Sequence, residues 1–152
     1  MSPDVPLAVK TKQAELTLDQ LAEVQPGMAR IMDEYGRRFW TMYYAAKAGN
    51  WELARYMHRN MLKLGATAAT LRPKFAEAMR EFEDRHMKAL GESLEAKDFP
   101  RFDAEYRRAI AGSDEYHDRF KYGYIRFRLP DHPPEWLRME PSSPPPTSKN
   151  SS

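Results

Sequence analysis

Four histidines are the side chains in this sequence with the widest chemical scope. His58, His86 and His117 each lie on the apolar stripe of a predicted helix, whereas His132 lies in a proline-rich stretch. An inward histidine is more often a hydrogen-bonded core residue than a ligand, although three of them on facing helices could bind a metal or a haem iron. Their positions in the sequence place the three histidines at different heights along the axes of the predicted helices. The pattern therefore does not establish that they lie in one common layer.

Two carboxylate–histidine pairs have the spacing found in di-iron carboxylate sites. Glu83 and His86 form a Glu-x-x-His motif, and Asp114 and His117 form an Asp-x-x-His motif. Such a site also needs an inward glutamate from each of two other helices. Glu34 is the one suitable glutamate on the first helix, the second helix offers one only near its start, and the two motifs occupy consecutive helices. We retain Glu83, His86 and His117 as candidate metal ligands and place a di-iron enzyme last among the hypotheses.

The rest of the composition excludes several other classes of site. The chain has no cysteine, which rules out disulfides, thiolate metal sites, iron–sulfur clusters and thioether-linked haem. It has no glycine-rich phosphate loop, zinc motif or nucleophile–base arrangement. Its 24 basic and 22 acidic side chains give a net charge of +2 without a basic segment, which argues against nucleic-acid binding. We expect a protein that is not an enzyme.

Helical periodicity dominates residues 16–138, which we expect to form one domain. The apolar stripes predict four helices, over residues 27–48, 51–70, 74–97 and 99–121. Asn50 and Asp98 have the positions of N-caps for the second and fourth helices. Thr17, with Gln20 in the capping-box position, predicts a short helical turn before the first. Four amphipathic helices with short connections predict an all-α fold, an antiparallel four-helix bundle, and the sequence shows no clear strand signal.

Both ends of the chain differ from this helical region. We expect residues 1–15 to be a flexible N-terminus and residues 139–152, rich in serine and proline, to be a disordered tail. Residues 122–136 predict an extended arm on the bundle surface, with Trp136 as its apolar anchor, because three prolines prevent a helix there. The sequence predicts no membrane span and no signal peptide. We therefore expect a cytoplasmic protein if the start is native, and a periplasmic one if a leader was removed.

Two runs near the end of the last predicted helix carry a resemblance to a known family. Residues 109–117 read Ala-Ile-Ala-Gly-Ser-Asp-Glu-Tyr-His, and residues 123–130 read Gly-Tyr-Ile-Arg-Phe-Arg-Leu-Pro. Together with residues 32–40 and 43–54, they resemble a bacterial group of cytochrome c-prime-like four-helix proteins. The likeness covers about residues 17–137. In that group a Cys-x-x-Cys-His motif follows the Ala-Gly pair and attaches the haem.

The resemblance implies a haem motif that has lost its attachment points. The two haem-linking cysteines fall at Ser113 and Tyr116, and the axial histidine falls at His117. Serine and tyrosine cannot add to haem vinyl groups as thiols do, so covalent haem is excluded. Related bundles often pair through their first helices, which makes a homodimer through residues 27–48 a candidate assembly.

These observations leave three functional hypotheses open. The first is a non-catalytic binding or accessory protein that retains the bundle, has no cofactor and acts through its surface or a residual cavity. The second is a protein that binds non-covalent haem or a metal ion through His117, with help from His86 or His58. The third is the di-iron carboxylate enzyme.

Overall fold

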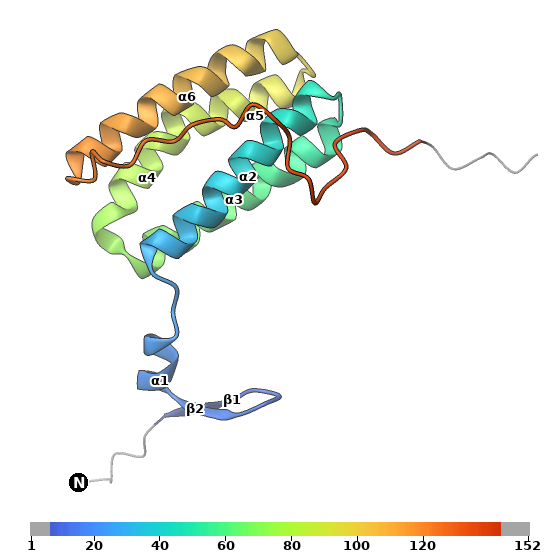
Figure 1. The fold of residues 1–152 in the computed structure, drawn as a ribbon. Helices are drawn as coiled ribbons and strands as arrows, with labels where there is room; N and C mark the ends of the chain where they lie inside the picture. Colours follow the sequence, from blue (N-terminus) through green and yellow to red (C-terminus); the bar gives the residue numbers. More distant parts are fainter. Residues whose placement is uncertain (1–6, 144–152) are drawn as a thin grey trace, which may run out of the picture.

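The computed structural model describes residues 7–143, which are mostly helical. Four helical segments lie side by side, and successive segments run in opposite directions (Figure 1). They are α2 (Met28–Lys47), α3 (Trp51–Leu71), the run from α4 (Ala76–Phe82) to α5 (Lys88–Glu95), and α6 (Phe99–Arg119). The prediction of a mainly helical protein is confirmed at this level. Within residues 7–143, no helix has both the length and the apolar character needed to cross a bilayer.

The long helices begin and end where the local sequence predicts. The Asn50 side-chain oxygen accepts the Leu53 backbone N–H at 3.1 Å, and the Asp98 carboxylate accepts the Arg101 N–H at 3.1 Å. Both bonds satisfy donors that the first turn of a helix leaves free. Gly49 follows α2 with a φ of 78°, a conformation that glycine adopts without strain. The N-caps predicted at Asn50 and Asp98 are therefore confirmed.

The third predicted helix, residues 74–97, departs from a regular α-helix in two places. It begins with a 3₁₀ turn, η1 (Pro73–Phe75), and is interrupted between α4 and α5 by a π turn, η2 (Glu83–Met87). In the π turn the Lys88 N–H donates to the Glu83 carbonyl, five residues earlier. The wider turn changes the direction of the side chains within it relative to an α-helix.

Aromatic and methionine side chains fill the space between the helices. The fully buried side chains of the helices include Met42, Met61, Met87, Leu90, Leu94, Phe102 and Tyr106. The rings of Phe39 and Tyr106 stack with their centroids 3.9 Å apart, and the Tyr106 hydroxyl donates to the Phe39 carbonyl at 2.9 Å. A buried hydroxyl needs such a partner, so this bond fixes α6 against α2.

The predicted inner face of α6 is correct at Phe102 and Tyr106, which are fully buried, but the buried positions shift by one residue in the second half of the helix. The apolar stripe predicted an inward His117, but Gly112 and Tyr116 are buried there, whereas Ser113 and His117 are half-buried. Both faces are compatible with a period of 3.6 residues. Ala109 and Gly112 carry little or no side chain, so the true inner face has a weak apolar signal in the sequence.

Residues 120–143 form an extended arm, without helix or strand, that runs back over the helices (Figure 1). The Trp40 indole N–H donates to the His132 carbonyl at 2.8 Å, and the Tyr44 hydroxyl donates to the Pro130 carbonyl at 2.7 Å. These bonds fasten the arm to α2. The predicted extended arm on the surface is thus present.

The anchor of this arm differs from the predicted one. Trp136 is 57% exposed, although its ring packs edge-on against Trp40 with centroids 5.4 Å apart. Pro134 and Met139 are buried instead. Met139 packs with the buried core residues of the helices, where its flexible side chain fits more readily than an indole does. The prediction of Trp136 as the anchor was wrong.

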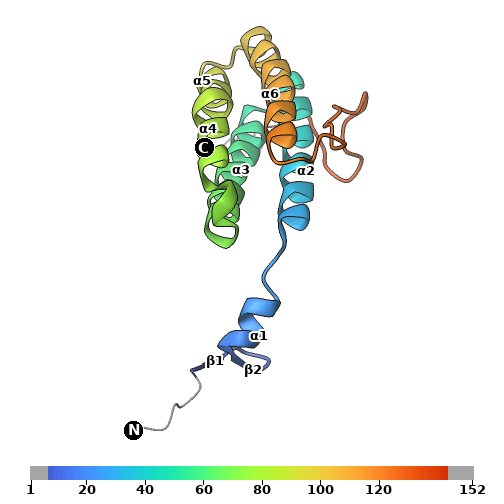
Figure 2. The same ribbon diagram turned by 90° about the vertical axis from the view of Figure 1, so that its left-hand side faces the viewer.

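A small unit precedes the helices and projects from the start of α2 (Figures 1 and 2). It contains the antiparallel strands β1 (Ala8–Lys10) and β2 (Glu15–Thr17), followed by the short helix α1 (Leu18–Glu23). The capping box predicted at Thr17 and Gln20 is confirmed. The prediction of a chain without strands was wrong, because two strands of three residues are too short to show a period of two.

Candidate functional site

Glu83, at the start of the π turn, directs its carboxyl toward α3. A Cβ atom on Gly65 would lie 2.6 Å from Glu83 Oε1, so the absence of a side chain at Gly65 makes room for the carboxyl. The hydroxyl of Tyr35, on α2, is buried without a hydrogen-bond partner. Burial, and then the Glu83 carboxylate, raise the pKa of Tyr35 far above its usual value. Burial, and then Asp84, raise the pKa of Glu83.

His86, at the fourth position of the π turn, lies against α6. A Cβ atom on Gly112 would lie 2.7 Å from His86 Cε1 and closer still to Nε2, so the ring occupies the notch that this glycine leaves. The side chain is buried, and its Nδ1 atom has no hydrogen-bond partner. Burial, and then the Arg85 guanidinium, lower the pKa of His86 and favour the neutral imidazole.

The structure therefore separates the members of the predicted metal set. Glu83 contacts Gly65 on α3, whereas His86 contacts Gly112 on α6. Because the π turn widens the angle between positions three residues apart, the Glu-x-x-His spacing does not bring its two side chains together here. Across residues 7–143, no three His, Asp or Glu side chains, these two and His117 included, are grouped to hold a metal ion.

His58 of α3 is bonded to the last residue of the π turn. Its Nε2 atom lies 2.7 Å from the Met87 carbonyl, and since a carbonyl can only accept, Nε2 carries the proton. A Cβ atom on Gly91 would lie 2.9 Å from His58 Cε1, so this glycine also makes room for a ring. Burial lowers the pKa of His58, while the bond to Met87 raises it. The neutral ring then presents the lone pair of Nδ1.

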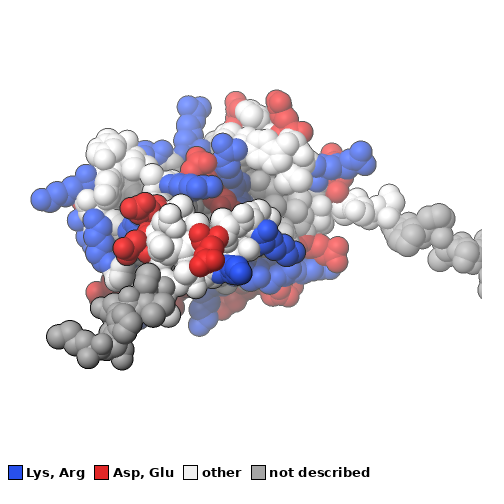
Figure 3. Space-filling view, turned by 90° about the horizontal axis from the view of Figure 1, so that it is seen from below, with Lys and Arg blue, Asp and Glu red and all other residues white. Residues whose placement is uncertain are grey.

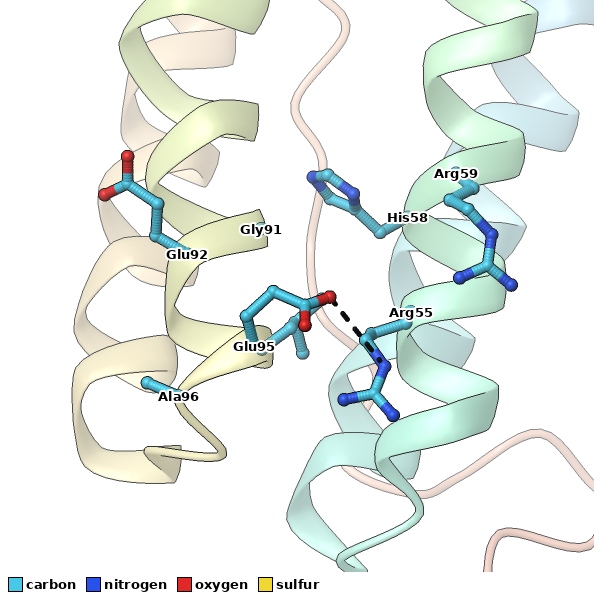
Figure 4. A pocket seen from close by; sticks show the side chains of 8 residues that line it. Arg55, His58, Arg59, Gly91, Glu92, Glu95 and Ala96 are labelled. Atoms are coloured by element: carbon cyan, nitrogen blue, oxygen red, sulfur yellow. Dashed lines mark ion pairs between the residues drawn. The ribbon is translucent and has the colours of Figure 1, made fainter.

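An open groove of about 620 Å³ lies beside His58, between α3 and α5 (Figure 4). Its polar lining consists of Arg55, His58, Arg59, Glu92 and Glu95. Glu95 lies 3.9 Å from Arg55 Nε, a long ion pair, and Glu92 pairs with Arg101 at 3.1 Å. Arg55 and Arg59 are one helical turn apart on α3. Two neighbouring guanidinium groups suit a small carboxylate or phosphate ligand.

The residues at the degenerate haem motif are engaged in packing. The Ser113 hydroxyl donates to the Ile110 carbonyl at 2.7 Å. The Tyr116 ring is buried edge-on against Phe82, with centroids 5.8 Å apart, and the Arg119 guanidinium lies 4.8 Å from its centroid. Burial raises the pKa of Tyr116. The position implied for the second haem-linking cysteine is therefore part of the core.

His117, the position implied for the axial ligand, is half-buried at the edge of α6. Its Nδ1 atom is buried and has no hydrogen-bond partner. A buried imidazole nitrogen without a partner is uncommon in folded proteins. His117 therefore retains a nitrogen that a ligand could engage.

No protein-family model, curated protein or solved structure matches this chain. The resemblance to cytochrome c-prime-like proteins accordingly stays a prediction.

The residues that the sequence did not single out are the glycines of the helices. Gly65, Gly91 and Gly112 each lie opposite a polar side chain from another helix. A glycine inside a helix lowers stability by about 1 kcal/mol relative to alanine, and at these three positions an added Cβ would lie within 3 Å of the neighbouring side chain. That signal was available in the sequence, although it does not identify the neighbour.

Proposed function

We propose that this chain is a non-catalytic binding or accessory protein on an antiparallel four-helix bundle of the cytochrome c-prime-like type, without covalent haem. The side-by-side packing of α2, α3, the α4–α5 run and α6, in alternating directions, supports the bundle. The absence of cysteine excludes thioether attachment.

The observation that carries the proposal is the filled interior at the degenerate motif. Tyr116 packs against Phe82, and His86 occupies the Gly112 notch one turn away. A porphyrin held beside His117 would compete with the Tyr116 ring for space. Displacing a buried aromatic side chain costs about 3 kcal/mol of burial free energy, which a non-covalent haem would have to offset.

Binding of a small anion in the groove beside His58 is the specific role we propose. Arg59 and Arg55 provide guanidinium donors, and the long Arg55–Glu95 pair leaves Arg55 able to turn toward a ligand. The neutral His58 would take up a proton on Nδ1 when an anion approaches, because a nearby negative charge favours the charged imidazole. The groove thus offers Arg55 and His58 to one carboxylate or phosphate group, with Arg59 at its outer edge, on the side of α3 turned away from α5 (Figure 4).

The second candidate is reversible binding of haem or a metal ion at His117, and the unpartnered Nδ1 of that residue favours it. The third candidate, a di-iron enzyme, has less support because Glu83 and His86 face different helices. Both alternatives require either that the purified protein contains metal, or that it takes up haem or metal in a way that depends on these residues.

A haemin titration followed by visible absorption separates the first two candidates. We expect no saturable Soret band in the wild-type protein, or one of equal intensity in His117→Ala and in the control His132→Ala, which changes a histidine of the arm. A one-to-one complex lost in His117→Ala and kept in His132→Ala would overturn the proposal. Elemental analysis of the same preparation addresses the di-iron alternative, which would require about two irons per chain.

A further inference from the structure

The groove between α3 and α5 has one cation and one anion facing each other. Arg55 on α3 and Glu95 on α5 point toward one another across it, with Arg55 Nε and a Glu95 carboxylate oxygen 3.9 Å apart (Figure 4). That separation is longer than a hydrogen bond, so the two groups attract each other without being bonded. The Glu95 side chain is 75% exposed and the Arg55 side chain 24%, which makes their ion pair weak and easily parted.

The other charged side chains of the groove are engaged or lie at its margin. Glu92 points away from His58 and pairs with Arg101 at 3.1 Å. Arg59 lies at the outer edge (Figure 4). The interior of the groove therefore carries one positive and one negative charge, which cancel. On the face of the molecule shown in Figure 3, basic and acidic side chains are likewise interspersed, so that face offers no field of one sign to a polyanion.

A ligand with only a negative charge fits this arrangement incompletely. Its carboxylate would bind Arg55 in place of Glu95 and would leave Glu95 beside a second negative charge, which is unfavourable. The neutral His58 offers the lone pair of Nδ1, because its Nε2 proton is donated to the Met87 carbonyl. That nitrogen must take up a proton before it can donate to an anion. It can accept a hydrogen bond from an ammonium group as it stands.

We propose that the preferred ligand of this groove is a small zwitterionic amino acid, whose carboxylate binds Arg55 and whose ammonium group binds Glu95 and His58 Nδ1. The ligand replaces the long Arg55–Glu95 contact by closer contacts of opposite sign, and no charge is left without a partner. The apolar part of the lining, which would contact the carbon atoms of the ligand, consists of Gly91, Leu94 and Ala96. This inference rests on the proposed function, because it names the ligand class of the same groove.

A comparison of β-alanine with propionate, followed by the amide resonances of the full chain, tests this ligand class. The two molecules share a carbon skeleton and a carboxylate, and only β-alanine carries an ammonium group. We expect β-alanine to bind the wild-type protein roughly tenfold more tightly than propionate, because the ammonium group adds charge-assisted hydrogen bonds. Arg55→Gln should weaken the binding of both ligands, since both use the carboxylate.

Glu95→Gln tests the ammonium subsite by itself. We expect β-alanine and propionate to bind this variant equally, whereas the control Glu115→Gln, at an exposed site on α6, should keep the wild-type preference. Saturable, Arg55-dependent binding of inorganic phosphate and propionate with no preference for β-alanine would overturn this inference and leave the anion site standing. If none of the three ligands shows saturable binding, the inference and the proposed role of the groove both fail.

Discussion

Replacing Gly112 by alanine tests the central packing feature of the candidate site. The new Cβ would lie 2.7 Å from His86 Cε1 and nearer to Nε2, well inside van der Waals contact. His86 is buried beside Phe82, with ring centroids 5.0 Å apart, so its ring has little freedom to withdraw. Either the imidazole leaves the notch or α6 moves away from the π turn.

The expected magnitude combines two opposing effects. Alanine stabilises a helix interior by about 1 kcal/mol relative to glycine. Overpacking of a close-packed interior costs about 2–3 kcal/mol when a ring must be displaced. We therefore expect Gly112→Ala to lower the free energy of unfolding by about 1–2 kcal/mol. In a His86→Ala background the clash is gone, and the same change should raise it by about 1 kcal/mol.

The assay is urea denaturation of the four proteins of this double-mutant cycle, followed by far-UV circular dichroism. The coupling free energy between Gly112 and His86 should be about 2–3 kcal/mol. Gly36→Ala is the matched control, because its Cβ would lie 3.8 Å from the Phe127 ring, an ordinary contact, and should stabilise α2. A Gly112→Ala protein as stable as Gly36→Ala, with no coupling to His86, would refute this account of the notch.

Two further predictions concern the histidines and the groove. Burial lowers the pKa values of His58 and His86, so the unfolded chain binds protons first as the pH falls through about 6.5, and stability should decrease there. The thermal midpoint should therefore decrease as the pH is lowered from 7.5 to 5.5, and it should decrease less in His86→Gln. An equal decrease in both proteins would contradict this reasoning. Inorganic phosphate should shift the amide resonances around His58 in a saturable way that Arg59→Gln weakens and Arg30→Gln, at an exposed site on α2, does not. Resonance shifts that do not saturate with phosphate, or that are unchanged in Arg59→Gln, would argue against an anion site.

The helix boundaries were largely predictable because local chemistry sets them. Asn50, Asp98 and Thr17 each cap a helix with their own side chain, and those bonds need no information about distant residues. The hairpin before α1 was not predictable in the same way. Its strands have three residues each, and no buried face imposes an alternating pattern on them.

The π turn was not predictable from the spacing of apolar residues in its helix. Phe82, His86, Leu90 and Leu94 are all buried, and each is four residues from the next. In a regular α-helix each such step turns the side chain about 40° further, so three steps would carry the stripe about 120° around the helix. The extra residue of the π turn absorbs this drift. The same spacing occurs without a π turn in α2, where Ile31, Tyr35, Phe39 and Tyr43 are all buried, so it does not by itself predict a π turn.

The same π turn explains why the predicted ligand set did not assemble. Glu83 and His86 satisfy the Glu-x-x-His spacing, but that motif positions two ligands together only on an α-helix. The wider turn directs one side chain to α3 and the other to α6. Spacing in the sequence thus predicts convergence only when the backbone between the two residues has the assumed geometry.

The glycines of the helices connect this packing to function. Each of three glycines makes room for one polar side chain of a neighbouring helix; the pairs are Gly65 with Glu83, Gly91 with His58, and Gly112 with His86. Glycine weakens a helix, so three such positions are consistent only with a packing that requires the close approach. Two imidazoles are thereby held inside or beside the core, and burial lowers the pKa of both. His86 and His117 both have a buried Nδ1 atom without a hydrogen-bond partner, but of the three histidines within the helices only His117 lies opposite none of these glycines. His117 is therefore the one histidine within the helices that does not fill the space left by a helix glycine, and the haemin titration is directed at that residue.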